Sequence, residues 1–199
     1  MTSKPKTPTL AFATVQAWEK WLHANHAKSA GVWLKLARVG ASAKSVTHPQ
    51  ALDIALRYGW IDGVSMSLDD THWLRKFVPR APRSLWSEKN RTRALELIEE
   101  GKMKPPGLHE VERAKADGRW AAAYAAQSEA KIPPDLSAAL ATNKKARDFF
   151  AALDSKNRYA ILHRLHTAKK AETRARRLAT FMTMLERGER LHVTATAKK

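Results

Sequence analysis

Basic and aromatic side chains alternate in the middle of the sequence in a pattern that suits the binding of an anion. Between Arg75 and Arg93 there are seven basic residues and one acidic residue, and Phe77 and Trp86 are interleaved with them. Guanidinium groups bind phosphates and carboxylates through paired hydrogen bonds and also stack on aromatic rings. This stretch therefore predicts contact with an anionic ligand or an acidic partner, with a nucleic acid as an alternative.

The same stretch contains a predicted helix start. Ser87 is typical of an N-cap, and the free backbone N–H groups at a helix N-terminus favour an anion. We expect Arg80, Arg83 and Asn90 to surround this terminus, with Trp86 beside them. One interpretation is a phosphate or carboxylate site, and the other is a capped helix with ordinary surface arginines.

Asp62 is the residue best suited to acid–base chemistry. It lies between two glycines in Gly59-Trp-Ile-Asp-Gly63, directly after an apolar stretch. Such an aspartate can act as a base, form an ion pair with Arg80 or Arg119, or cap a turn through its own backbone. We favour the turn cap. The enzymatic alternative is a pocket that gathers Asp62, Arg80, Trp86, Asn90, Arg119 and Trp120.

A second basic cluster lies near the C-terminus. Between Lys156 and Arg177 there are eight basic residues and one acidic residue. On a single helix, Arg174 and Arg177 lie opposite an apolar stripe that includes Leu165, Ala171 and Ala175. Such a face suits phosphates or an acidic partner, and a solvated helix surface is the alternative.

Several classes of protein are excluded or disfavoured. The chain has no cysteine, which excludes disulfides and thiolate metal sites. His23 and His26 have a spacing that suits metal ligands, but no third ligand accompanies them, so we expect no metal and no cofactor. Phosphate-loop and common hydrolase motifs are absent from the sequence. The net charge of +17 favours polyanion partners and solubility without specifying a fold.

We expect a cytoplasmic protein without a membrane span. No run of apolar residues approaches the roughly 18 needed to cross a bilayer, and the N-terminus lacks the apolar segment of a secretory signal. The sequence leaves the oligomeric state open.

Hydrophobic periodicity predicts an α+β fold, in which a mixed part of helices and short strands precedes an all-α module. Helices are expected over residues 12–25, 47–58, 87–100, 108–116 and 120–127, and strands over 31–38 and 71–78. After Ile132-Pro-Pro134 the pattern is entirely helical, over residues 135–141, 144–153 and 156–188. These elements predict an α+β domain at 10–127 and a helical module at 128–190. Flexible tails are expected at 1–9 and 191–199.

Five motifs, in this order, resemble the YdeI/OmpD-associated family, also called bacteriocin-protection proteins. They are Gly31-Val-Trp-Leu-Lys-Leu36, Ala51-Leu-Asp-Ile-Ala-Leu-Arg-Tyr-Gly-Trp-Ile-Asp-Gly63, Pro79-Arg80 with Ser84-Leu-Trp-Ser87 and Asn90, Ala114-Lys-Ala-Asp-Gly-Arg-Trp120, and Ala168-Lys-Lys-Ala-Glu-Thr-Arg-Ala-Arg-Arg177. The resemblance runs from about Phe12 to Gly188. It implies a small α+β protein with a helical C-terminal module, and it implies no established enzymatic activity.

Two departures from the family pattern matter. Relatives often have Cys-Phe where this chain has Arg57-Tyr58, so a thiol role is excluded here. Relatives also often have proline at the position of Ala171, which implies a helix break near Lys170. The leading hypothesis is a non-catalytic binding protein that uses Arg80, Arg83, Arg174 and Arg177, with neighbouring aromatic residues, to hold an anionic ligand or partner.

Overall fold

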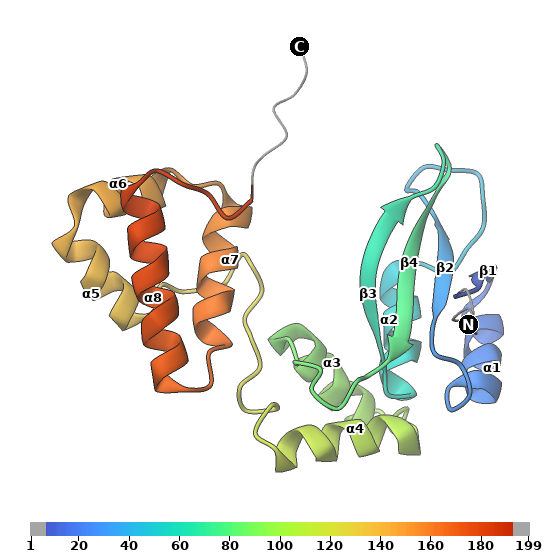
Figure 1. Ribbon diagram of the computed structural model, residues 1–199. Helices are drawn as coiled ribbons and strands as arrows, with labels where there is room; N and C mark the ends of the chain where they lie inside the picture. The colour runs from blue at the N-terminus through green and yellow to red at the C-terminus, as the bar shows by residue number, and fades with distance from the viewer. Residues whose placement is uncertain (1–6, 193–199) are drawn as a thin grey trace, which may run out of the picture. The chain divides into compact units, whose positions relative to one another are not determined.

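The chain folds into two compact units, Met1–Ala123 and Tyr124–Lys199, in a computed structural model that describes residues 7–192 (Figure 1). The unit boundary lies four residues before the expected one. Most of the two expected tails, residues 1–6 and 193–199, lies outside the described residues. Thr9, which we assigned to the N-terminal tail, begins a strand. The first unit combines a sheet with helices and the second is helical, which confirms the α+β class.

The first unit is built on a four-stranded sheet with the order β1-β2-β4-β3. The strands are β1 (Thr9–Ala11), β2 (Val32–Ala37), β3 (Trp60–Ser67) and β4 (His72–Pro79). β1 runs parallel to β2, and the other two pairings are antiparallel. The expectation of a turn around Asp62 is wrong, because this residue lies within β3 and is paired with Phe77 of β4.

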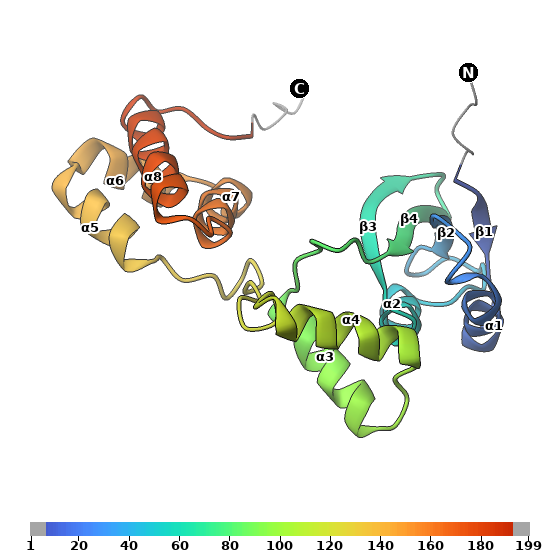
Figure 2. The same ribbon diagram turned by 60° about the horizontal axis from the view of Figure 1, so that its bottom comes forward.

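Two helices cover one face of this sheet, as Figure 2 shows from a second direction. They are α1 (Val15–Asn25), which is capped by Thr14, and α2 (His48–Arg57), which is capped by the predicted Thr47. Trp18 packs edge-on against Phe77, and its indole N–H donates to the carbonyl of Ala51 at 3.1 Å. Side chains alternate between the two faces of β2, so Val32, Leu34 and Leu36 point into this core.

Two further helices, α3 (Glu88–Glu99) and α4 (Pro105–Ala116), enclose a second apolar cluster of the same unit. Its buried members are Leu56, Trp86, Ala94, Leu97, Met103, Val111, Ala114 and Ala123. The predicted helix at 120–127 is wrong, since these residues form turns and irregular structure. Arg91 donates to the carbonyl of Trp120 at 3.2 Å, and a helix would need that carbonyl for its own hydrogen bonding.

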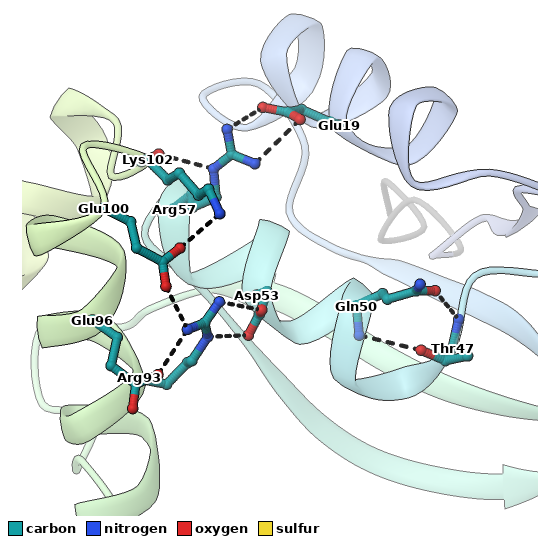
Figure 3. Close-up of polar contacts among 9 residues, drawn as sticks. All are labelled: Glu19, Thr47, Gln50, Asp53, Arg57, Arg93, Glu96, Glu100 and Lys102. Carbon is teal, nitrogen blue, oxygen red and sulfur yellow. Dashed lines mark hydrogen bonds and ion pairs between the residues drawn. The ribbon is translucent and has the colours of Figure 1, made fainter.

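Ion pairs join α1 and α3 to α2 (Figure 3). Arg57 at the end of α2 pairs with Glu19 of α1, with a shortest distance of 2.6 Å, and its Nε donates to the carbonyl of Lys102 at 2.8 Å. Lys102 in turn pairs with Glu100 at 2.7 Å. The helices are therefore positioned by directional contacts as well as by the apolar clusters.

The second unit consists of α5 (Pro134–Thr142), α6 (Lys144–Ala152), α7 (Ser155–His166) and α8 (Ala171–Glu186) around its own core. The helix break expected from the family resemblance is confirmed between His166 and Ala171. The single apolar stripe predicted over residues 156–188 is wrong, because Ala171 and Ala175 are exposed. No helix within residues 7–192 is long and apolar enough to cross a membrane.

Candidate functional site

Arg80 lies just beyond the end of β4, on the face of the sheet opposite Asp62. Its backbone N–H donates to the carbonyl of Gly59 at 3.0 Å, which continues the pairing of β3 and β4 by one residue. Side chains alternate between faces along a strand, so Phe77 faces α1 and α2 whereas Arg80 faces away. The Arg80 guanidinium lies over the ring of Trp86, 3.6 Å from its centroid, and donates to the carbonyl of Leu85 at 3.2 Å.

Arg119 reaches the same loop from the end of α4. The positive φ of Gly118, +77°, turns the chain so that Arg119 is only 3% exposed. Its Nε lies 2.8 and 2.7 Å from the two carboxylate oxygens of Asp117, and its Nη1 donates to the carbonyl of Ser84 at 2.7 Å. Arg80 and Arg119 therefore hold the loop 81–86 through its carbonyl groups.

These side chains form what we call the arginine–tryptophan cluster, which comprises Arg80, Trp86, Arg113, Arg119 and Trp120. Trp120 packs edge-on against Trp86, with ring centroids 4.9 Å apart. Arg113 forms an ion pair with Glu110 and contacts the carbonyl of Arg80 at 3.5 Å. All five residues belong to the first unit.

The cluster holds more buried hydrogen-bond donors than acceptors. Within residues 7–192, no acceptor pairs with three of its buried nitrogens, namely Nη2 of Arg119, Nε1 of Trp86 and Nε of Arg113. A buried donor without a partner costs about 1–3 kcal/mol. These three nitrogens therefore carry a cost that hydrogen bonds within the described residues do not offset.

Arg83 and Asn90 border the cluster at the start of α3. Arg83 is exposed on the loop, and Asn90 is half-buried in the first helical turn. The predicted N-cap is confirmed, since Ser87 Oγ accepts from the backbone N–H of Asn90 at 3.2 Å. Glu88 also lies in this turn, so the helix N-terminus already has an acid beside it.

Asp62 instead forms part of a polar group on the other face of the sheet. Its carboxylate accepts from Arg75 Nε at 2.8 Å and contacts His48 Nε2 at 2.9 Å. Burial raises the pKa of Asp62, but the hydrogen bonds from His48 and Arg75 outweigh it and leave the pKa below its usual range. The ion-pair interpretation thus identified the right type of contact but the wrong partner. Asp62 pairs with Arg75, and not with Arg80 or Arg119.

This placement removes the pocket that the enzymatic hypothesis requires. Arg80, Trp86 and Arg119 share one cluster, whereas Asp62 lies across the sheet from it. Its carboxylate is ionised and bound to a cation, so it is a poor proton acceptor.

The two arginines predicted in the C-terminal module stabilise the helices of the second unit. Arg174 of α8 donates to both carboxylate oxygens of Asp135 in α5, at 2.7 and 2.8 Å, and to the carbonyl of Leu165 at 2.7 Å. Arg177 donates to the carbonyl of Arg164 at 2.5 Å. Both cations therefore satisfy carbonyl groups in the last turn of α7, where the helix dipole favours positive charge.

Sequence reasoning missed Arg75, His48 and Arg113. For Arg75 a signal was present, because it occupies the same face of β4 as Trp73 and Phe77. The two histidines considered as metal ligands lie at the end of α1, where Nδ1 of His26 contacts the carbonyl of Leu22 at 3.1 Å and its ring lies 5.4 Å from that of Tyr58.

Two family models match separate parts of the chain. Residues 10–110, just over half of the chain, match the model described as Domain of unknown function (DUF8412). Residues 129–188 match the model described as Bacteriocin-protection, YdeI or OmpD-Associated. No curated protein and no solved structure matches the chain. The chain therefore belongs to the DUF8412 family, whose model covers just over half of it, and its residues 129–188 match the YdeI/OmpD-associated, bacteriocin-protection model, so that of the five motifs only Ala168–Arg177 lies within that match.

Proposed function

We propose that the first unit is a non-catalytic binding module for a small anion, such as a phosphate or a carboxylate, which it holds at the arginine–tryptophan cluster. The observation that carries this proposal is the group of three buried donors, on Arg119, Trp86 and Arg113, that pair with no acceptor in the described residues. A guest with several oxygens matches such a group, because oxyanions accept several charge-assisted hydrogen bonds at once.

The loop 81–86 provides the route to these donors. Arg80 and Arg119 hold it through the carbonyls of Leu85 and Ser84, which are neutral acceptors. An anion competes well against a neutral carbonyl for a guanidinium, because hydrogen bonds between two charged groups are about twice as strong. The exposed Arg83 lies on the same loop and attracts the anion to its entrance.

The burial of the cluster favours a small anion over a nucleic acid. Nucleic-acid backbones are neutralised by cations displayed on the surface. Arg80 and Arg119 are 4% and 3% exposed, and Arg174 is engaged by Asp135. We therefore restrict the site to the first unit and leave Arg174 and Arg177 out of it.

The test measures binding of phosphate, sulfate and acetate by titration calorimetry on the full chain at constant ionic strength. Trp86→Phe keeps the aromatic ring under Arg80 and removes one buried donor, so we expect several-fold weaker binding. Arg83→Ala should slow association and weaken binding more at low salt than at high salt. Arg176 is an exposed arginine of the second unit. Arg176→Ala makes the same change in net charge as Arg83→Ala and should have no effect on binding.

Two outcomes would contradict the proposal. One is the absence of saturable binding by any of the three anions at millimolar concentration. The other is an equal loss of affinity in Arg83→Ala and Arg176→Ala with no loss in Trp86→Phe, which would indicate a general effect of net charge.

A further inference from the structure

An open groove lies between α5 and α6, two consecutive helices of the second unit (Figure 1). Its volume is about 440 Å³. Five of its eight lining residues are apolar, and two of the others are Arg147 of α6 and Arg158 of α7. All eight lie within the described residues, and none carries a carboxylate. The groove shares no residue with the arginine–tryptophan cluster.

The apolar part of the groove has a floor, a side and two gaps. Leu140 and Phe150 belong to the core of the second unit and form the floor. Ile132, which precedes α5, is 47% exposed and forms the side. Ala141 and Ala151 are exposed and short, so they leave room above the floor on either helix. The groove therefore offers an apolar surface to which a chain of CH₂ groups can bind.

Arg158 is fixed at the end of α6 with part of its hydrogen-bonding capacity unused. Its Nη2 donates to the carbonyls of Ala151 and Leu153 at 2.8 and 3.2 Å, and its guanidinium lies 5.8 Å from the ring centroid of Phe150. Both of its hydrogen bonds within residues 7–192 start from Nη2, and no acceptor there pairs with its Nε. Nη1 thus remains for an acceptor in the groove.

Arg147 adds a second positive charge to the same lining. Its side chain is 50% exposed, and its Nε lies 3.6 Å from the carboxylate of Asp148. That carboxylate is hydrogen-bonded instead by Lys144, at 2.9 Å. Arg147 is therefore only weakly compensated, and the groove combines an apolar floor with two cations and no anion. This combination complements a ligand that has an apolar chain and an anionic head.

We infer that this groove binds a medium-chain carboxylate, whose alkyl chain lies over Leu140 and Phe150 against Ile132 and whose carboxylate pairs with Arg147 and Arg158. The volume lies within the range of about 300–1,000 Å³ that is usual for small-molecule sites, which also combine apolar walls with a few polar groups. Each helix contributes a single turn to the lining, about 6 Å in length, which favours a short chain over a long one.

The requirement for an alkyl chain separates this site from the anion site proposed in the first unit. The test uses octanoate as the probe on the full chain and follows the methyl signals of Ile132 and Leu140 and the ring signals of Phe150 by NMR. We expect saturable shifts at millimolar concentration. Butyrate keeps the charge and shortens the chain, whereas octanamide keeps the chain and removes the charge. Both should bind at least fivefold more weakly than octanoate.

Two pairs of variants test the two halves of the site. Arg147→Ala should weaken octanoate binding at least threefold, whereas Arg176→Ala, the loss of an exposed arginine of α8 outside the groove, should leave it unchanged. Ala151→Leu fills the groove and should weaken binding at least fivefold. Its neighbour Ala152 is also exposed but does not line the groove, so Ala152→Leu should have no effect. Because these positions are exposed, the variants leave the core intact, and circular dichroism verifies their folding.

The inference is overturned by octanoate that produces no saturable shift of the three residues. It is also overturned by butyrate or octanamide that binds as tightly as octanoate, or by equal effects within either pair of variants. Octanoate affinity that falls in Arg83→Ala and not in Arg147→Ala would place the ligand in the first unit and refute this groove, while leaving the anion site of the first unit intact.

Discussion

Arg93 of α3 holds Asp53 of α2 through two parallel hydrogen bonds, Nε to Oδ1 at 2.9 Å and Nη2 to Oδ2 at 2.7 Å (Figure 3). The same guanidinium contacts Glu96 at 2.7 Å and Glu100 at 3.2 Å. The hydrogen bond from Asp53 is the main cause that raises the pKa of Arg93, and Glu96 adds to it. This pair therefore fixes α3, the helix that begins beside Trp86, on α2.

Arg93→Lys should destabilise the first unit by about 1 kcal/mol, because lysine keeps the charge and loses the paired geometry. Chemical denaturation at pH 7 measures the free energy of unfolding. As a control, Lys144→Ala disrupts the exposed ion pair with Asp148 and should leave stability unchanged within error. Equal stability of Arg93→Lys and the natural protein would show that the paired geometry contributes nothing.

Asp62→Asn should destabilise the sheet by about 2 kcal/mol, because it leaves the partly buried Arg75 and His48 without their anion. Since the folded pKa of Asp62 is lowered, its contribution is fully present above the unfolded pKa of about 3.9 and is lost as the pH falls through the folded pKa. Urea denaturation between pH 7 and pH 2 measures this dependence.

The Asp62→Asn variant should therefore lose less stability on acidification than the natural protein. Asp70→Asn, a change at an exposed position in the same hairpin, serves as the control and should follow the natural protein. An identical pH profile for all three would contradict the ion pair.

Gly107→Ala should destabilise the first unit by about 3 kcal/mol through overpacking. A Cβ at this position would collide with the carbonyl of Arg57 and would lie 2.5 Å from the sulfur of Met103 and 2.8 Å from the carbonyl of Leu56. Gly101→Ala is the matched comparison, because its Cβ meets no atom within 4 Å but its φ is +65°. That strain should cost about 1 kcal/mol. A smaller loss for Gly107→Ala than for Gly101→Ala in thermal unfolding would refute the close packing of α4 on α2.

Local signals in the sequence predicted the helix ends well. Thr47 and Ser87 accept hydrogen bonds from the third helical residue, and Gly101 and Gly118 adopt the positive φ expected after a helix. These features depend on residues three or four apart, which a sequence displays directly.

Features that depend on distant residues were not predicted. The strand β3 contains Gly63, Ser65 and Ser67, which have low strand propensity, and it is stabilised by pairing with β4. The partner of Asp62 follows from that register, which brings Arg75 beside it across a bulge. The burial of Arg119 likewise depends on a loop 35 residues earlier in the chain, whose Ser84 carbonyl it contacts.

The two units should fold as separate fragments if the chain is divided where the structure divides it. The apolar clusters of the sheet and of α3 and α4 lie wholly in the first unit, and the cluster of α5 to α8 lies wholly in the second. A fragment 124–199 keeps the hydrogen bond from Tyr159 to the Ala125 carbonyl and the ring contact of Tyr124 with His163, whereas a fragment 128–199 loses both.

The longer fragment should therefore be more stable than the shorter one by about 1–2 kcal/mol. Circular dichroism and urea denaturation of both fragments and of 1–123 measure the effect. The full-length Tyr159→Phe variant, which removes only the hydroxyl, should account for about 1 kcal/mol of the difference. Fragments 124–199 and 128–199 of equal stability would show that residues 124–127 do not belong to the second unit, and an unfolded fragment 124–199 would show that this unit depends on the first.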